Sequence, residues 1–532
     1  MKQENIKKDI INFFLQKGIL ISPDFLNNLD DNFDFKKLFS LIEKETDSSK
    51  FLIFTKEINN LLGNLPKEIN WLEFDQARTL SEKGNNQLYE KFIEYLKNNK
   101  IKTEIKKEVV NSAESGTVNV LFSYEEAIKK RDIQDFVVFF NTRYKALEKI
   151  LRHRQELQNI LSISRIVNKK EKESVSLIGI VKDRTVTANG NIILEIEDTS
   201  GSIKVLISKN KPELFNLAKD VVLDEIIGIV GVNGDNIVFA NNVIWPDIPL
   251  NKELKKAPDE GYAIVLSDLH VGSNQFLGDK LNNFLKWING DLGSEQQKKI
   301  ASKVKYIIIA GDLVDGVGIY PEQDEELVIK DVNQQYEECA RLLKQIPSDI
   351  QLIICPGNHD AMRIAEPQPQ LYRDFAKPVW DLPNVTMVSN PSLINIHASN
   401  SFSGFDLLVY HGYSFDYYVA NVESIRNGGG YDRADLIMKF LLQRRHLAPT
   451  HTSTLYIPDI RKDYLVIEQI PDFFIAGHIH KSYVANYRNI TMICGSCWQA
   501  KTPFQEKVGH NPEPARVPII NLQTREVKIL RF

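Results

Sequence analysis

The second half of the chain is built from short apolar runs, and each run stops at a group of polar side chains that can bind metal. The clearest example is "LIICPGNHDA", in which a run typical of a buried strand ends at a Pro-Gly pair and continues with Asn358, His359 and Asp360. Apolar runs that alternate with helical segments are typical of α/β folds, which carry functional side chains on the loops after their strands. This pattern therefore predicts a sheet whose strand ends hold a site.

Four further motifs of this kind lie between Pro258 and the C-terminal end of the chain. Residues two apart on a strand point the same way, so a D-x-H or G-H-x-H pair directs two ligands to one side. Mixed carboxylate, imidazole and amide ligands favour manganese, iron or zinc over an all-oxygen magnesium site. The motifs contribute Asp268 and His270 of "SDLHVG", Asp312 and Asp315 of "GDLVDG", His411 of "YHGYS", and His478 and His480 of "GHIH".

The segments before these motifs differ in the spacing of their apolar residues. Residues 1–98 place apolar side chains at helical spacing and predict a helical N-terminal module, and 99–120 predict a flexible linker. Residues 121–170 predict a helical connector whose basic side chains form a solvated face. Residues 171–250 alternate β-branched residues with turn sequences, which predicts a small barrel of the oligonucleotide-binding (OB) type, and 258–532 form the α/β domain.

Composition limits the classes of function that remain. The 532 residues are 43% hydrophobic and 26% charged, and the formal net charge of -4 argues against binding nucleic acid by bulk positive charge alone. No apolar run approaches the ~18 residues of a membrane span, so we expect a soluble, cytoplasmic protein without a membrane partner. Cys494 and Cys497 form a C-x-x-C pair, but without a second pair nearby a redox or zinc role is disfavoured.

Taken together, the five motifs resemble the pattern of the calcineurin-like metallophosphoesterase superfamily over roughly residues 261–532. The resemblance implies a β-sandwich flanked by helices, so the predicted fold class is multidomain: a helical N-terminal module, an OB-type barrel and an α/β metallophosphoesterase domain. It also implies two divalent metal ions, manganese first, with iron or zinc as alternatives. One ion would be held by Asp268, His270, Asp312 and His480, and the other by Asp312, Asn358, His411 and His478.

The same resemblance implies roles for the remaining motif residues. His359 would be the catalytic acid that meets the leaving oxygen, and Asp360 would orient its ring. Asp315 would hold one of the metal ligands in place. Because the sequence carries every motif without substitution, an active site is favoured over a vestigial one.

The order of helical module, linker, barrel and phosphoesterase domain is similar to that of the family of small subunits of archaeal family D DNA polymerases. The segments "DFVVFFNTRYKALEKILRHR", "HNPEPARVPIINLQT" and "GSCWQAKTPFQ" carry the resemblance, which covers most of the chain after about Tyr124. It implies a manganese-dependent 3′–5′ exonuclease that proofreads for a separate large catalytic subunit. The implied partners are that subunit and a single-stranded or frayed DNA 3′ end.

Three alternatives stay open at this point. The chain could be a stand-alone phosphatase or cyclic-nucleotide phosphodiesterase, or a non-catalytic assembly subunit. The segment from Tyr417 to Arg433 could be a mobile loop that stacks a DNA end with Tyr417 and Tyr418, or a loop that packs on the domain. The apolar end "EVKILRF" could contact a sliding clamp, although a closing β-strand explains it better.

Overall fold

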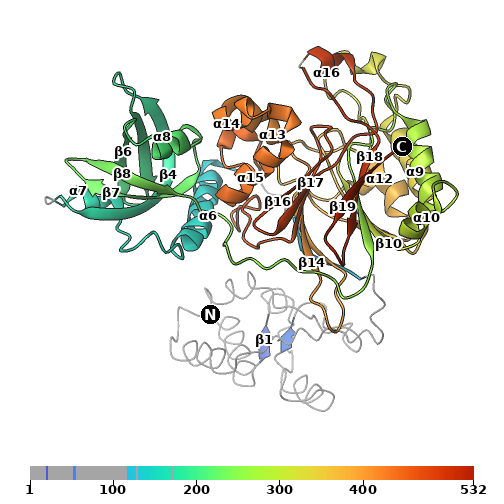
Figure 1. The fold of residues 1–532 in the computed structure, drawn as a ribbon, viewed down its shortest axis with the longest axis horizontal. Coiled ribbons are helices and arrows are strands. Elements are labelled where there is room, and N and C mark those ends of the chain that lie inside the picture. Colours follow the sequence, from blue (N-terminus) through green and yellow to red (C-terminus); the bar gives the residue numbers. More distant parts are fainter. Residues whose placement is uncertain (1–18, 22–51, 55–116, 127–129, 170–171, 508) are drawn as a thin grey trace, which may run out of the picture. The chain divides into compact units, whose positions relative to one another are not determined.

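The computed structural model describes the chain in several stretches, which Figure 1 shows in colour: residues 19–21, 52–54, 117–126, 130–169, 172–507 and 509–532. The chain divides into two compact units, Met1–Asn111 and Ser112–Phe532. In the first unit the described residues form a parallel pair of short strands, β1 (Ile19–Ile21) and β2 (Leu52–Phe54). The helices predicted within 1–98 and most of the predicted linker lie outside the described residues.

Two six-stranded sheets organise the second unit. In the first sheet, β9 to β12 run parallel, and β18 and β19 continue it in antiparallel fashion beside β9. Its strands, in spatial order, are β12 (Val385–Met387), β11 (Gln351–Cys355), β10 (Val304–Ala310), β9 (Tyr262–Leu266), β18 (Arg516–Asn521) and β19 (Val527–Arg531). The second sheet consists, in spatial order, of β16 (Tyr483–Tyr487), β17 (Ile490–Cys494), β15 (Phe473–Ala476), β14 (Phe405–Val409), β13 (Ser392–Ile396) and β3 (Val118–Ser123).

The two sheets pack face to face, and one buried apolar cluster joins Ile308 and Ile353 of the first sheet to Leu407 and Ile475 of the second. Strand β10 is buried on both faces, because the side chains that alternate with Ile308, such as Ile307, belong to a second cluster made with helices. This double burial explains why the strand sequences are continuous apolar runs. The predicted β-sandwich is confirmed.

Helices cover both outer faces of the sandwich (Figure 1). Buried side chains of α9, α11 and α12 pack on the first sheet, and those of α13 and α15 pack on the second. The helices that follow β9 in the sequence are α9 (Gly278–Ile288), α10 (Glu295–Ala301), α11 (Val332–Leu343), α12 (Arg373–Trp380), α13 (Phe415–Asn421), α14 (Glu423–Asn427), α15 (Ala434–Arg444) and α16 (Pro503–Lys507), with short 3₁₀ turns η2 (Gln323–Glu325), η3 (Gly430–Asp432) and η4 (His451–Ser453). Among the helices in the described part of the chain, none is long and apolar enough to cross a membrane.

A closed five-stranded barrel precedes the sandwich in the sequence. Helix α8 connects its third and fourth strands, and the barrel has an apolar core of its own. This confirms the OB-type barrel predicted from alternating β-branched residues and turns. The barrel strands are β4 (Ser174–Val186), β5 (Ile192–Asp198), β6 (Gly201–Ile207), β7 (Ile226–Asn233) and β8 (Ile237–Ile244), with α7 (Ile163–Val167) before them and α8 (Pro212–Lys219) within.

The connector before the barrel differs from the sequence prediction at one end. Residues assigned to the linker and the start of the helical connector form β3, an edge strand that pairs antiparallel with β13. The partner strand lies about 270 residues further along the chain, so local periodicity could not reveal the pairing. At the other end of the chain, β19 pairs with β18 and the Phe532 ring packs against Phe284 and Trp287, as expected for a closing strand.

The predicted helical connector contains α6 (Ile133–Leu151), and one of its basic side chains is buried instead of solvated. Arg143 is 1% exposed, and its Nε lies 2.5 Å from Asp463 Oδ2. The imidazole of His446 donates to the same carboxylate through Nε2 (2.9 Å). Burial opposes ionisation of Asp463, but the charge of Arg143 and the hydrogen bond from His446 outweigh it and lower its pKa. This network ties α6 to the segment that follows α15.

Removing the carboxylate from this network should leave the buried guanidinium without its counter-charge. We expect Asp463→Asn to lower the free energy of unfolding by about 3 to 5 kcal/mol, the usual cost of breaking a buried ion pair. Chemical denaturation of the full chain measures it. The matched control is Asp381→Asn, which removes an exposed pair with Lys377 and should cost less than about 1 kcal/mol. Equal losses in the two variants would contradict the prediction.

The same network makes stability depend on pH. His446 is satisfied as a neutral ring, because its Nδ1 accepts from the backbone N–H of Ala448 (2.9 Å). Burial, followed by the charge of Arg143, lowers the pKa of His446 to about 4. An unfolded histidine has a pKa of about 6.5. Between about pH 6.5 and pH 4, the unfolded chain therefore binds a proton at this histidine that the folded chain does not bind. This stabilisation is complete above pH 6.5 and is lost as the pH falls toward 4.

Between pH 7 and pH 5, we expect the wild type to lose about 2 kcal/mol more unfolding free energy than His446→Gln, which lacks the titrating ring. Denaturation curves of both proteins at each pH measure the difference. The same pH dependence in both would show that His446 titrates equally in the folded and unfolded chains.

Candidate metal centre

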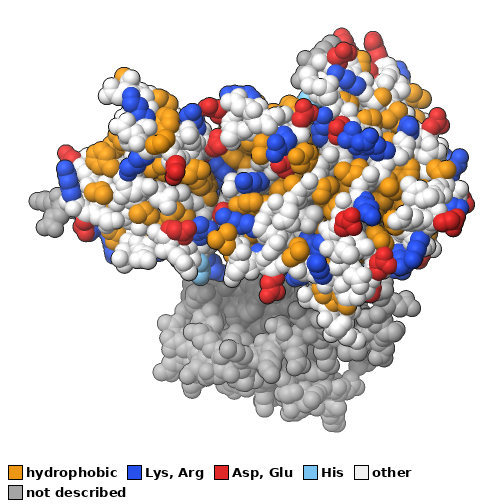
Figure 2. All heavy atoms as spheres, in the orientation of Figure 1, with side chains coloured by type: hydrophobic (Ala, Val, Ile, Leu, Met, Phe, Trp, Pro, Cys, Tyr) orange, Lys and Arg blue, Asp and Glu red, His pale blue; other side chains and the backbone are white. Residues whose placement is uncertain are grey.

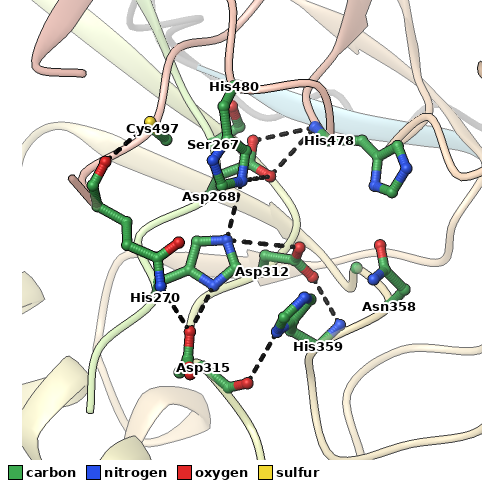
Figure 3. A network of polar contacts seen from close by, with 12 residues as sticks. Ser267, Asp268, His270, Asp312, Asp315, Asn358, His359, His478, His480 and Cys497 are labelled. Carbon is green, nitrogen blue, oxygen red and sulfur yellow. Dashed lines mark hydrogen bonds and ion pairs between the residues drawn. The ribbon is translucent and has the colours of Figure 1, made fainter. Parts of the chain in front are cut away.

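The loops after five strands meet at one end of the sandwich. Strands β9, β10 and β11 of the first sheet are parallel neighbours, so their carboxyl ends lie at one edge, and β14 and β15 are parallel neighbours in the second. Figure 3 shows the polar side chains of these loops directed toward one another. The residues brought together are Asp268, His270, Asp312, Asn358, His359, His411, His478 and His480.

Asp312 Oδ2 faces the imidazoles of two sets of donor atoms. In one set, His411 Nε2 lies 3.2 Å from Asp312 Oδ2 and 2.9 Å from Asn358 Oδ1. In the other set, His270 Nε2 lies 3.8 Å from Asp312 Oδ2 and 3.1 Å from His480 Nε2. The carboxylate of Asp268 completes this second set, 3.4 Å from His480 Nε2. A cation at either set would therefore meet carboxylate and imidazole together.

A backbone hydrogen bond fixes the position of His478. Its N–H donates to the carboxylate of Asp268 (3.0 Å), and its ring centroid lies 5.2 Å from that of His411. The imidazole of His478 therefore lies beside that of His411.

The backbone of the site is held in a conformation that non-glycine residues rarely adopt. Asp268, His270, Asp312, His478 and His480 have φ values of 52°, 51°, 53°, 72° and 55°. Such left-handed residues persist only where the surrounding structure over-determines them, and they cluster at functional sites. At Gly357, an added Cβ would collide with the carboxylate of Asp312, so this position requires glycine.

Two histidines are held in place through their Nδ1 atoms, so that their Nε2 atoms face the centre of the site. His270 Nδ1 lies 3.0 Å from Asp315 Oδ1, and His411 Nδ1 lies 2.7 Å from the carbonyl oxygen of Ala310. Because a neutral imidazole has one N–H, donation from Nδ1 leaves the lone pair on Nε2. Metal-binding histidines are typically held in this way. The donor set and its supports therefore fit divalent metal ions.

The charges around Asp312 also favour a cation at this site. Burial disfavours both charged forms, yet attraction to Asp312 raises the pKa of His411 to about 10. Burial is likewise outweighed at Asp312, where His411 and His359 hold the pKa of the carboxyl well below its ordinary value. The buried carboxylates thus favour positive charge at the position where a cation would sit.

The surroundings of His359 correct one expectation. The carboxylate of Asp360 accepts hydrogen bonds from the Gly357 N–H (2.9 Å) and the Tyr336 hydroxyl (3.1 Å), so it holds the loop and does not orient the imidazole. The His359 ring is held instead through Nδ1, 2.8 Å from the carbonyl oxygen of Asp315. Burial, reinforced by the charge of Asp312, raises the pKa of Asp360 to about 7.

Sequence reasoning missed side chains that contact the predicted site residues. Asp416 Oδ2 lies 2.9 Å from His478 Nε2, and Gln505 Nε2 lies 3.0 Å from His480 Nδ1. Gln499 donates to Asp315 Oδ1 (2.9 Å). Each is a single residue outside the motifs, and no spacing rule connects it to its partner. The only signal was proximity in the sequence for Asp416, which follows His411 by five residues.

The segment from Tyr417 to Arg433 is mostly helical, in α13, α14 and η3. Tyr418 is fully buried in the cluster on the second sheet, and its hydroxyl donates to Ser453 Oγ (3.0 Å). Tyr418 therefore cannot stack on a DNA end, which contradicts half of that interpretation. Tyr417 is only partly buried in the same cluster.

The C-x-x-C pair is part of the interior. Cys494 and Cys497 are buried free thiols, and the candidate metal groups found among the described residues contain neither. Burial raises the pKa of the Cys497 thiol to about 12, which disfavours the reactive thiolate.

Comparison with known proteins relates this chain to subunits of DNA polymerases. Residues 263–485 match the family model for the B subunits of DNA polymerases alpha and epsilon. The DNA polymerase II small subunit of Methanothermobacter thermautotrophicus is 39% identical over 401 residues, which cover 75% of this chain and 80% of that protein. Those of Pyrococcus furiosus (38%) and Methanocaldococcus jannaschii (40%) match over 75% and 73% of this chain, and the match spans 64% of each relative.

With this family match and these relatives, the OB-type barrel and the helix-flanked sandwich with its buried His/Asp cluster belong to the class of small subunits of DNA polymerases. Within this class, the chain belongs to the family of archaeal DNA polymerase II (family D) small subunits.

Because Asp312 contributes to both donor sets, its removal should affect metal binding more than any surface change. We expect saturating Mn²⁺ to raise the thermal unfolding midpoint of the wild type, since ligand at about 100 times its Kd adds about 2.7 kcal/mol. Asp312→Asn should abolish most of this gain. The control Asp374→Asn, on the exposed side of α12, should keep it. An unchanged gain in Asp312→Asn would rule out metal at this site.

Proposed function

We propose that this chain is the small subunit of a two-subunit replicative DNA polymerase and that its metal centre is a 3′–5′ exonuclease that removes mispaired ends. The observation that carries the proposal is the buried cluster around Asp312, in which carboxylates and the imidazoles of His270, His411 and His480 lie within reach of one another. A subunit that served only in assembly would have no need to keep strained residues and paired histidines at this place.

The side chains of the two sets around Asp312 would hold two divalent ions, with manganese as the first candidate. When bound, such ions activate water and neutralise charge on a phosphodiester during in-line displacement. The first ion would be held by Asp268, His270, Asp312 and His480, and the second by Asp312, Asn358, His411 and His478.

His359 is the group in this chain best placed to handle a proton. Its backbone N–H donates to Asp312 Oδ1 (2.8 Å), its ring centroid lies 4.6 Å from that of His270, and the residue is half-buried. The bond from Nδ1 to the Asp315 carbonyl is available in both protonation states, so the ring keeps its orientation while Nε2 gains or loses a proton. His359 can therefore donate from Nε2 to the oxygen that leaves when the terminal nucleotide is cut off.

A large subunit is the partner that the relatives' descriptions as small subunits support. Charge supports it as well. On the face in Figure 2, Lys and Arg side chains are interspersed with acidic and apolar ones, and the whole chain has a net charge of -4. A duplex is bound chiefly through its phosphates, so we infer that the large subunit provides much of the grip on DNA.

The test follows a 5′-labelled primer with a mismatched 3′ end, incubated with Mn²⁺ and the full chain, alone and with the large subunit. The wild type should shorten the primer stepwise from its 3′ end. His359→Ala should slow this by about 10²- to 10⁴-fold, the usual contribution of a general acid. The control His153→Ala replaces an exposed histidine at the end of α6 and should leave the rate unchanged.

Digestion that is absent in every combination would contradict the exonuclease. Hydrolysis of a small phosphodiester by the same preparation would then indicate a phosphodiesterase with another substrate. A lack of both activities would indicate an assembly subunit.

A further inference from the structure

One ligand histidine depends on a carboxylate that none of the five motifs contains. Asp315, which supports His270, belongs to a motif, and the carbonyl that supports His411 is main chain. His478 instead has its Nε2 held by Asp416, the second residue of α13, at 2.9 Å. We propose that Asp416 is a positioning residue that directs Nδ1 of His478 to the second metal position, an inference that rests on the proposed metal centre.

The tautomer follows from the chemistry of the pair. A carboxylate can only accept, so His478 must carry its proton on Nε2 to bond with Asp416. The lone pair then lies on Nδ1, and this is the nitrogen that remains for a metal. His270 and His411 have the opposite arrangement, because their Nδ1 atoms are the ones engaged. Without Asp416, either nitrogen of His478 could carry the proton and the ring could turn.

Helix α13 is anchored firmly enough to fix the carboxylate. Phe415 and Tyr418, on either side of Asp416 in the sequence, are both fully buried. Before them, Ser414 donates through Oγ to the carbonyl of Leu447 (2.6 Å) and through its N–H to the hydroxyl of Tyr410 (3.2 Å). The carboxylate therefore reaches His478 from a rigid element, which is the requirement for orienting a ligand.

His478 is also fixed from the opposite side. Its N–H donates to the carboxylate of Asp268, and its backbone is left-handed with φ of 72°. The backbone bond places the residue, and Asp416 sets the rotation and tautomer of the ring. Asp268 belongs to the first donor set, so the two sets are joined through the main chain of His478.

A purely structural ion pair would behave differently in experiment. The Asp416 side chain is 45% exposed, and exposed ion pairs contribute little to folding stability. Loss of Asp416 should therefore leave the thermal midpoint of the metal-free protein close to that of the wild type. Its effect should be confined to the metal that His478 binds.

The experiment titrates the metal-free full chain with Mn²⁺ and measures free ion by electron paramagnetic resonance, together with thermal midpoints. The wild type should bind two ions. Asp416→Ala should weaken one of them about 10- to 100-fold, the usual loss when the support of a ligand histidine is removed, and leave the other within about twofold. Asp416→Asn retains an oxygen acceptor without charge, so its affinity for that ion should fall between those of the wild type and Asp416→Ala. The control Glu423→Gln, on exposed α14, should match the wild type.

Unchanged affinity for both ions in Asp416→Ala would overturn the inference, even if nuclease activity fell. Equal weakening of both ions with a lower midpoint of the metal-free variant would also overturn it, because the role would then be structural. A wild type that binds no Mn²⁺ would overturn the metal centre and this inference with it. A wild type that binds two ions but cuts no DNA would contradict only the exonuclease, and the affinities of the Asp416 variants would still decide this inference.

Discussion

The buried carboxylate of Asp312 is the constraint around which the site is arranged. A charge that is 1% exposed is stable only where compensating groups surround it, and here the imidazoles of His411 and His270 both approach its Oδ2 atom. The left-handed backbone at Asp312 and the glycine at position 357 are consequences of bringing the loops so close. This local structure is costly unless a cation completes it, which is the physical link between the strained geometry and metal binding.

The sandwich makes this arrangement possible because each sheet brings its strand ends to the same edge. Buried charges connect the rest of the second unit to the sandwich. Arg143 of α6 pairs with Asp463, and Arg444 of α15 pairs with Glu225 of the barrel at 2.9 Å. Because such pairs are costly to break, they hold the barrel and α6 to the elements that cover the second sheet. In the proposed subunit, these contacts would give the metal centre a firm support when it meets a DNA end.

Much of the site could be predicted because each motif is local. The spacing of Asp268 and His270, or of His478 and His480, is set by one strand end, and the apolar run before it marks where the strand stops. The errors were non-local. Asp360 lies next to His359 in the sequence, yet its carboxylate turns toward the loop backbone. Tyr418 lies in a segment whose composition suggests a binding loop, but its side chain is buried by packing on the second sheet.

The sequence by itself determined the chemistry: which residues can bind metal, the strands that carry them, the barrel and the family. It did so because strand periodicity and ligand spacing act over a few residues. Only the tertiary structure decided that β3 completes the second sheet, that Arg143 is buried, and that Asp416 supports His478. These contacts join segments that are separated by tens to hundreds of residues, and their geometry arises only when the two sheets and their helices pack together.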